Sequence, residues 1–345
     1  MISLICVGDI NLKFEEKLKF ENEIINIFEK GDIRFGNLET VVSDKEGIIK
    51  EKAINFKTNS QKLELLSPLK FSILNIANNH ILDFGEDLKR ETKNNILKYG
   101  INVIGENTNS YDVKIMNIKN KSIAFIGIQF FDQKKSSILN KKIKELRKKV
   151  DYIILSIHWG EEICLSPTVR QRKWAYQLIN NGTDIIIGHH PHVLQGIEKY
   201  KNGIIVYSLG NFQFKIEKDD VDLTQYTDIL EISLEKNKMK IKEYPVFILK
   251  NGNPTLKLNE EEKEKYIKIK EKCNYYIENL NYFNYLKEMS YYNIPDNLNS
   301  WKIRKNKEEK KYLLKKMKWF LHPNIIISYI LFLINKVFVN GEKSK

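Results

Sequence analysis

The chain has 345 residues, of which 42% are hydrophobic and 11% aromatic, so it can bury the core of one large α/β domain with an appendage. This composition excludes a globally disordered chain. Three cysteines, Cys6, Cys164 and Cys273, lie far apart without a CxxC pair, which excludes a disulfide framework and a structural zinc knot. The net charge of +13 comes mainly from residues 300–345, which hold twelve basic and three acidic side chains.

Residues 1 to about 210 alternate short apolar runs with amphipathic stretches, the pattern of an α/β domain with a largely buried sheet. We expect strands at 2–7, 33–36, 71–76, 122–128, 151–157, 184–187 and 203–208, and helices near 15–29, 60–67, 86–99, 137–149 and 168–181. Farther along, the alternation over 228–248 predicts an antiparallel hairpin around Lys236-Asn237. Residues 259–290 predict one or two charged helices, and residues 300–340 a basic, then apolar, tail.

The N-terminal sequence MISLICVGDI indicates a first strand that enters a loop at Gly8-Asp9. A secretory signal needs a basic start and an apolar stretch of about 7–15 residues before a cleavage site. This stretch has neither, so we expect a cytoplasmic protein.

Polar side chains follow most of the apolar runs of the expected sheet. The residues at these positions are Asp9; Asn37 and Glu39; Asn78, Asn79 and His80; His158; His189, His190 and His192; and Asn211. In open α/β sheets, ligands bind beyond the carboxyl ends of the strands, so we expect a ring of oxygen and nitrogen donors at one edge of the sheet. Such donors suit one or two divalent metal ions, and the residue types do not distinguish Mn, Fe and Zn.

Some of these residues also have ordinary structural explanations. Asp9 could cap a turn, and His158 could be a satisfied core histidine. His190 and His192 are harder to explain in this way, because a His-x-His sequence after a strand is poor core material and Pro191 fixes the shape of the loop. Taken jointly, the residues predict a metal site.

Six segments, in this order, resemble the signature blocks of the CapA family. They are VGDI, GNLET, NIANNHILDFG, SIHWGEE, IIIGHHPHVLQGIE and YSLGNFQF, and the resemblance covers about residues 2–245. CapA proteins are bacterial capsule-biosynthesis proteins associated with poly-γ-glutamate and related to the calcineurin-like metallophosphoesterases. The resemblance implies a four-layer α/β/β/α sandwich of the metallophosphoesterase type at residues 1–250, with a helical, basic C-terminal extension at residues 251–345.

The resemblance also implies metal-ligand roles. Asp9 and His192 correspond to ligands of a first metal, and Glu39 stands where related phosphoesterases have a bridging Asp. The residues that correspond to ligands of a second metal are Asn79, His158 and His190, with His189 as the alternative to His190.

His80 resembles the histidine that assists the leaving group, a role that suits an imidazole with a pKa near the working pH. Asp83 and Glu162 are candidates to orient His80 and His158, and the alternative is that both are solvated loop carboxylates. Trp159 either lines the cleft or packs in the core. Further candidates for supporting contacts or alternative ligands are Asn37, Asn78 and Asn211.

Two positions depart from the phosphoesterase pattern. Asn11 stands where the sequence Asp-x-His is usual, so the first metal loses an imidazole. Glu39 is longer than the usual Asp by one methylene group. These departures leave the number of metal ions, and catalysis itself, open.

These features predict a metal-dependent hydrolase or transferase acting in the synthesis or processing of a capsule or other cell-surface polymer, on a phosphoester or γ-glutamyl substrate. The alternative is a non-catalytic accessory protein that binds an anionic polymer or a synthase partner through the same cleft. No recognised nucleic-acid-binding motif accompanies the basic residues, so nucleic acid is not an expected partner.

The C-terminal tail places a basic stretch before the apolar run Ile325 to Ile334. An interfacial helix there would bury the apolar residues and leave the lysines among anionic head groups. Such a helix would hold a cytoplasmic protein at the membrane surface, beside a membrane-bound synthase. The alternative is a helix packed on the body of the domain.

Overall fold

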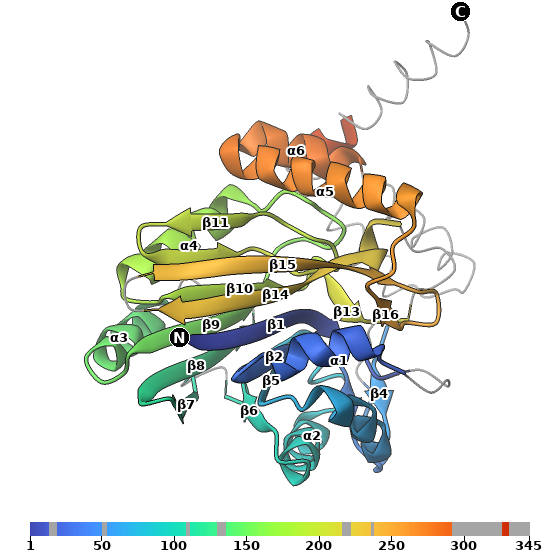
Figure 1. The fold of residues 1–345 in the computed structure, drawn as a ribbon, viewed down its shortest axis with the longest axis vertical. Helices are drawn as coiled ribbons and strands as arrows, with labels where there is room; N and C mark the ends of the chain where they lie inside the picture. The colour runs from blue at the N-terminus through green and yellow to red at the C-terminus, as the bar shows by residue number, and fades with distance from the viewer. Residues whose placement is uncertain are drawn as a thin grey trace, which may run out of the picture.

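Two β-sheets lie face to face in the computed structural model, with helices on both outer sides (Figure 1). The structure describes residues 1–13, 19–49, 54–107, 111–129, 136–215, 222–235, 238–291 and 326–330. The predicted basic and apolar tail therefore lies outside the described residues, apart from 326–330. Within the described residues, no helix combines the length and apolar content needed to cross a bilayer.

The first sheet has the strand order β16-β15-β14-β1-β2-β5-β6, and β13 pairs with the end of β1. Its strands are β1 (Ile2–Ile10), β2 (Ile33–Leu38), β5 (Ile73–Asn75), β6 (Asn102–Ile104), β13 (Asn211–Gln213), β14 (Tyr226–Glu235), β15 (Lys238–Ile248) and β16 (Pro254–Thr255). Strands β1, β2, β5 and β6 run parallel to one another, and β14 pairs antiparallel with β1 and β15. The predicted hairpin over 228–248 is confirmed as β14 and β15.

The second sheet has the order β11-β12-β10-β9-β8-β7. Its strands are β7 (Val113–Ile118), β8 (Lys121–Gln129), β9 (Tyr152–His158), β10 (Ile185–His189), β11 (Ile197–Tyr200) and β12 (Gly203–Val206). The central strands β8, β9, β10 and β12 are parallel, so their carboxyl ends meet at one edge. A separate pair joins β3 (Val41–Val42) to β4 (Lys57–Thr58).

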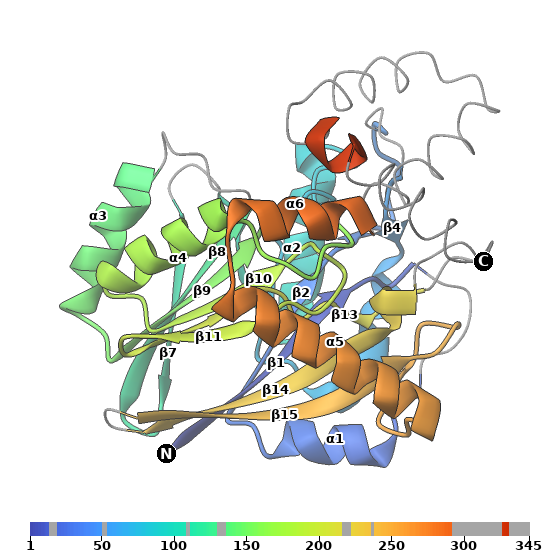
Figure 2. The same ribbon diagram turned by 90° about the horizontal axis from the view of Figure 1, so that it is seen from above.

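Helices cover the outer face of each sheet and complete four layers, which confirms the predicted α/β/β/α sandwich. On the first sheet lie α1 (Asn22–Glu29), the 3₁₀ helix η1 (Ser60–Leu69) and α2 (Glu86–Lys98); on the second lie α3 (Ser136–Arg147) and α4 (Val169–Asn180). Figure 2 shows α1 and α3 on opposite sides of the sandwich. A further 3₁₀ helix, η3 (Asp222–Gln225), precedes β14.

Side chains alternate between the two faces of each strand and so build the apolar layers. In β1, Leu4 faces the second sheet and Ile5 faces the outer helices. In β10, Ile186 faces the outer helices, whereas Ile185 and Ile187 face the first sheet. Because both faces are buried, such strands appear in the sequence as unbroken apolar runs.

Two helices follow the sandwich, as the sequence predicts for 259–290: α5 (Glu260–Glu278) and α6 (Tyr282–Tyr291). Asn59 caps the N-terminus of η1. Asn259 caps α5: its side chain accepts the backbone N–H of Glu262, and the Glu262 carboxylate accepts the backbone N–H of Asn259. Helix α5 packs on the body through buried Cys273 and Tyr276. The division of the chain at residue 250 stays a prediction.

Candidate metal centre

The polar residues predicted at the strand ends come together, but they come from two sheets. Asp9 and Glu39 belong to the first sheet and its loops, whereas His158 and His189 end strands of the second. The prediction of donors along one sheet edge is therefore wrong. Strands that are buried on both faces give the same apolar pattern whichever sheet they join, so the pattern cannot separate the sheets.

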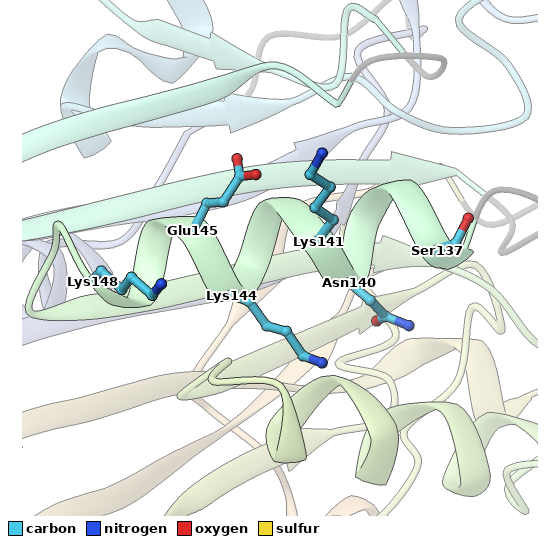
Figure 3. Close-up of a pocket in the computed structure, with 6 residues that line it drawn as sticks. All are labelled: Ser137, Asn140, Lys141, Lys144, Glu145 and Lys148. Atoms are coloured by element: carbon cyan, nitrogen blue, oxygen red, sulfur yellow. The ribbon is translucent and has the colours of Figure 1, made fainter.

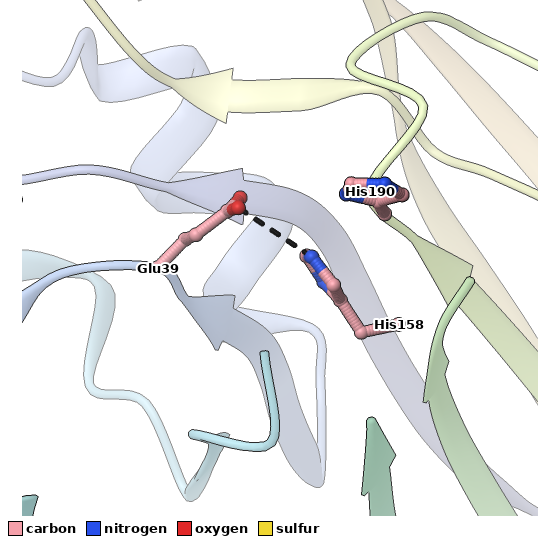
Figure 4. A group of neighbouring side chains, drawn as sticks. All are labelled: Glu39, His158 and His190. Carbon is pink, nitrogen blue, oxygen red and sulfur yellow. Dashed lines mark ion pairs between the residues drawn. The ribbon is translucent and has the colours of Figure 1, made fainter. Parts of the chain in front are cut away.

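Glu39, His158 and His190 form the first group that could hold a metal ion (Figure 4). His158 Nε2 lies 3.5 Å from Glu39 Oε1, and the His158 and His190 ring centroids are 4.7 Å apart. His158 Nε2 also lies 2.7 Å from Asn79 Oδ1. The proximity of Asn79 and His158 is the arrangement expected if both bind one metal.

Asp9, Glu39 and His192 form a second group that could hold a metal ion. Asp9 Oδ2 lies 3.6 Å from His192 Nδ1 and accepts the backbone N–H of His190 at 3.2 Å. Glu39 belongs to both groups, which is the position expected for a bridging ligand. Asn211 Oδ1 lies 2.8 Å from His192 Nδ1, so Asn211 orients this imidazole.

The remaining candidates support these groups. His189 is fully buried, and its Nδ1 lies 3.2 Å from Asp9 Oδ1, but it belongs to none of the groups of described residues that could hold a metal. Asn37 donates to the same Asp9 oxygen at 2.8 Å. Asn78 donates to the carbonyl of Leu38 at 2.8 Å and thus holds the segment before Glu39.

The sequence left two alternatives for Glu162: that it orients His158, or that it is a solvated loop carboxylate. His158 Nε2 contacts Asn79. Glu162 is exposed and forms a third group with His190 and His192. It stands at the rim of the site.

His80 has the support that the sequence predicted. Its Nδ1 lies 2.6 Å from Asp83 Oδ2, and both side chains are buried. Asp83 also accepts the backbone N–H of Phe56 at 3.0 Å, which fixes the carboxylate. The other ring nitrogen of His80 lies 3.9 Å from Glu39 and so faces the candidate metal groups.

Three residues of the site were not predicted from the sequence. Asn75 donates a hydrogen bond to Asn37 Oδ1 at 2.8 Å and so extends the chain of hydrogen bonds that leads to Asp9. The sequence feature that could have indicated Asn75 is a polar residue inside a buried apolar run. Phe56 packs on the His80 ring with centroids 4.2 Å apart, and Phe214 packs on the His192 ring at 5.1 Å. Aromatic residues in loops carry no signal that distinguishes a site wall from ordinary packing.

Trp159 belongs to the core. It is 1% exposed, stacks on Tyr207 and donates its indole N–H to the Tyr207 carbonyl at 3.0 Å. Of the two alternatives that the sequence left open, core packing is the one observed.

Burial and charge set the protonation of the centre. Burial alone would raise the pKa of Asp9, but the hydrogen bond from His189 and the neighbouring histidine charges outweigh it and hold this pKa below its usual range. Burial lowers the pKa of His158 well below its usual value, and His190 beside it adds to the shift. Burial also lowers the pKa of His190. These shifts favour the ionised form of Asp9 and the neutral forms of the two imidazoles, which are the forms that bind metal ions.

These residues fit a divalent metal. The buried Nδ1 atom of His190 has no hydrogen-bond partner in the described part of the chain. An orphaned buried nitrogen is costly unless a ligand satisfies it. Carboxylate, amide and imidazole donors suit Mn, Fe or Zn.

Gly8 allows the loop before β13 to approach Asp9. A Cβ atom at Gly8 would lie 2.0 Å from the Gly210 carbonyl oxygen, which accepts the Asp9 N–H at 2.9 Å. We expect Gly8→Ala to lower the free energy of unfolding by about 1–3 kcal/mol, since the backbone must shift, and to weaken Mn²⁺ binding by moving Asp9. Urea unfolding and calorimetric titration would measure both.

The matched control is Gly203→Ala, whose Cβ would meet a side-chain methyl of Ile179 at 2.6 Å. A flexible side chain can move where backbone cannot, so this variant should lose less stability and keep its Mn²⁺ affinity. Equal effects of the two variants would contradict the assignment to Gly8.

A surface depression lies on the outer helical layer. It has a volume of about 360 Å³ and is lined by residues of α3 and the turn after it (Figure 3): Ser137, Asn140, Lys141, Lys144, Glu145 and Lys148. None of the metal-ligand candidates lines it. It therefore plays no part in the centre.

Comparison with known proteins gives matches over the same region. The family model described as bacterial capsule synthesis protein PGA_cap matches residues 4–216. The chain is 31% identical over 241 residues to the PGA biosynthesis protein CapA of Bacillus subtilis (strain 168), covering 62% of this chain and 63% of that protein. It is 33% identical over 203 residues to the capsule biosynthesis protein CapA of Bacillus anthracis, covering 52% of this chain and 49% of that protein.

The chain thus spans less than two thirds of the length of these curated relatives. Solved structures with a similar fold include a hypothetical protein from Thermus thermophilus, at 12% identity and a TM-score of 0.47, covering 71% of this chain and 98% of that one. Another is the 5'-nucleotidase of Candida albicans, at 11% identity and a TM-score of 0.42, covering 79% and 54%.

Proposed function

Because the chain belongs to the bacterial capsule synthesis protein PGA_cap family, we propose that it is a metal-dependent hydrolase or transferase that synthesises or processes a cell-surface polymer of the poly-γ-glutamate type. Two of its relatives are named for PGA or capsule biosynthesis. The reacting bond is a phosphoester or a γ-glutamyl amide.

The observation that carries this proposal is the pair of three-donor groups that share Glu39. Asp9 and His192 would hold one ion with it, and His158 and His190 would hold another. Asn79 would add an amide oxygen beside His158. Such ions would supply Lewis-acid chemistry, which activates a water molecule near neutral pH and polarises a phosphoryl or acyl oxygen.

The side chains around this centre have separate tasks. Asp9 supplies negative charge, and the neutral imidazoles of His158 and His190 supply lone pairs. His80, held by Asp83, donates a proton to the leaving group. Phe56 covers the His80 ring and limits the access of water to it.

The test is to purify the protein under reducing conditions, remove metal with a chelator and add Mn²⁺, Fe²⁺ or Zn²⁺. Bound metal is measured by elemental analysis, and turnover with bis(p-nitrophenyl) phosphate and with γ-glutamyl amides. We expect one or two ions per chain and metal-dependent turnover of one substrate class. A chain that binds no metal, with a His190→Ala variant that behaves like wild type, would overturn the proposal.

The second candidate is a non-catalytic accessory protein that binds an anionic polymer or a synthase partner through the same site. Asn11 and Glu39, which depart from the phosphoesterase pattern, favour it. Stoichiometric metal binding without turnover of any phosphoester or γ-glutamyl substrate would support this function.

A further inference from the structure

Two loops carry most of the candidate ligands of the second sheet. The β9 loop, residues 159–168, follows His158, and the β10 loop, residues 190–196, follows His189. The two loops are bonded to each other: the N–H of Ile163 donates to the Pro191 carbonyl at 2.9 Å, and Gln195 Nε2 donates to the Cys164 carbonyl at 2.7 Å. A displacement of one loop would therefore strain the other.

The backbone of these loops is strained. His190 has φ 99°, His192 has φ 58° and the β-branched residue Ile163 has φ 53°. Positive φ is unfavourable for residues other than glycine, and most of all for a β-branched side chain. Such conformations persist only where the surrounding structure imposes them.

Helices α5 and α6 are the surrounding elements that can impose these conformations on the two loops. Figures 1 and 2 show the two helices together on one side of the sandwich. Cys273 Sγ lies 3.3 Å from the Leu194 carbonyl, and a Cβ at Gly196 would lie 2.2 Å from Ile277 Cγ1. Side chains of both loops and of α5 form one buried apolar cluster, which includes Ile163, Leu165, Val193, Leu194, Ile269, Cys273 and Tyr276.

Glu288 of α6 lies between the helices and the β9 loop. Its side chain is fully buried and accepts the hydroxyl of Tyr276 of α5, and the backbone N–H of Leu165 in the β9 loop lies close enough to lower the pKa of the same carboxyl. A buried carboxylate between donors on two elements favours one relative position of them, because moving either donor away leaves the buried group less satisfied. Burial has the larger effect and raises the pKa of Glu288.

We propose that α5 and α6 hold the β9 and β10 loops in their strained conformation and thereby position His190 and His192 for metal, with Glu288 as the positioning residue. Residues 259–291, which lie outside the segment matched by the family model, are then an integral part of the metal site. This inference rests on the proposed function only in that the site binds a metal ion.

The test compares Glu288→Gln with Asp184→Asn in the full chain. Asp184 is a matched control because it too is a carboxylate with partners on other segments: it accepts the backbone N–H of Ile153 at 2.7 Å and pairs with Arg147. It differs from Glu288 in its position, since it lies before β10, at the opposite end of the second sheet from the histidines. Both substitutions remove one charge from a partly or fully buried carboxylate. We expect Glu288→Gln to weaken Mn²⁺ binding by about 2–30-fold, the range for a residue that acts on a site without touching the ligand, and Asp184→Asn to change it less than two-fold at a similar loss of thermal stability.

Hydrogen exchange of the metal-free protein gives a second readout. Amides of the β9 and β10 loops should exchange faster in Glu288→Gln than in Asp184→Asn, and Gly196→Ala, which displaces Ile277 without changing any charge, should act in the same direction. Equal exchange in the three variants and wild type overturns the positioning role. If wild type binds no Mn²⁺, the proposed function fails, and the exchange data alone then decide whether the helices hold the loops.

Discussion

Glu39→Gln is expected to weaken Mn²⁺ binding strongly. The loss should exceed the roughly 10–100-fold effect that is typical when a residue hydrogen-bonded to a metal ligand is removed. Glu39 belongs to both the Asp9–His192 group and the His158–His190 group, so one substitution removes a charged donor from each. Glutamine keeps the volume and one oxygen but not the charge. The measurement is calorimetric titration of the chelator-treated protein with Mn²⁺.

Thermal unfolding separates this effect from misfolding. Wild type should gain about 2.7 kcal/mol of stability at a Mn²⁺ concentration one hundred times Kd, because the ion binds only the folded state. Glu39→Gln should show almost no gain. Without metal, its midpoint should stay close to wild type, since the substitution replaces a fully buried charge by a neutral group of the same shape.

Glu162→Gln is the comparison within the same site. Glu162 is exposed and belongs only to the outer group with His190 and His192, so its loss should weaken Mn²⁺ binding less than loss of Glu39. If both variants bind Mn²⁺ as wild type does, Glu39 is not a shared ligand and the two-group description of the centre fails.

Much of the fold could be predicted because its strands are buried on both faces. The run Ile185 to Ile187 has no polar interruption, and the helix after Thr168 begins with a capping box that the sequence signals through nearby Ser166-Pro167. The sheet to which each run belongs could not be predicted, since that depends on crossovers between segments far apart in the chain. The short strands β3, β4 and β6 and the edge strands β7 and β11 were also missed, because a few residues carry little periodicity.

Candidate site residues could be selected from the sequence because metal ligands are rare residue types at strand ends. The resemblance to the CapA family points to His80, and Asp83 was one of two alternatives left open, an orienting partner of His80 or a solvated loop carboxylate; in the structure the two side chains are in contact. The position of Glu162 beside His190 and His192 could not be predicted from the sequence, because it depends on the path of a strained loop. The role of Glu288 is also invisible in the sequence, where it is one of many acidic residues in charged helices.

His80→Ala is expected to lower kcat by about 10²–10⁴-fold while leaving Mn²⁺ binding within a few-fold of wild type. His80 Nδ1 is held by Asp83 at 2.6 Å, and its Nε2 faces the centre 3.9 Å from Glu39, but His80 is not among the described residues grouped as able to hold a metal. We therefore expect it to transfer a proton and not to bind the ion. The measurement is steady-state turnover of the Mn²⁺-loaded protein beside calorimetric titration.

The dependence on the leaving group distinguishes proton donation from a structural effect. Esters with a good leaving group such as p-nitrophenolate need little protonation, so His80→Ala should slow them far less than alkyl esters or amides, whose leaving groups need a proton. Asp83→Asn should give the same ranking with smaller losses, because the imidazole remains but loses its orienting carboxylate. A uniform loss across leaving groups, or a parallel loss of Mn²⁺ binding, would instead make His80 a residue that supports Glu39 and the metal groups.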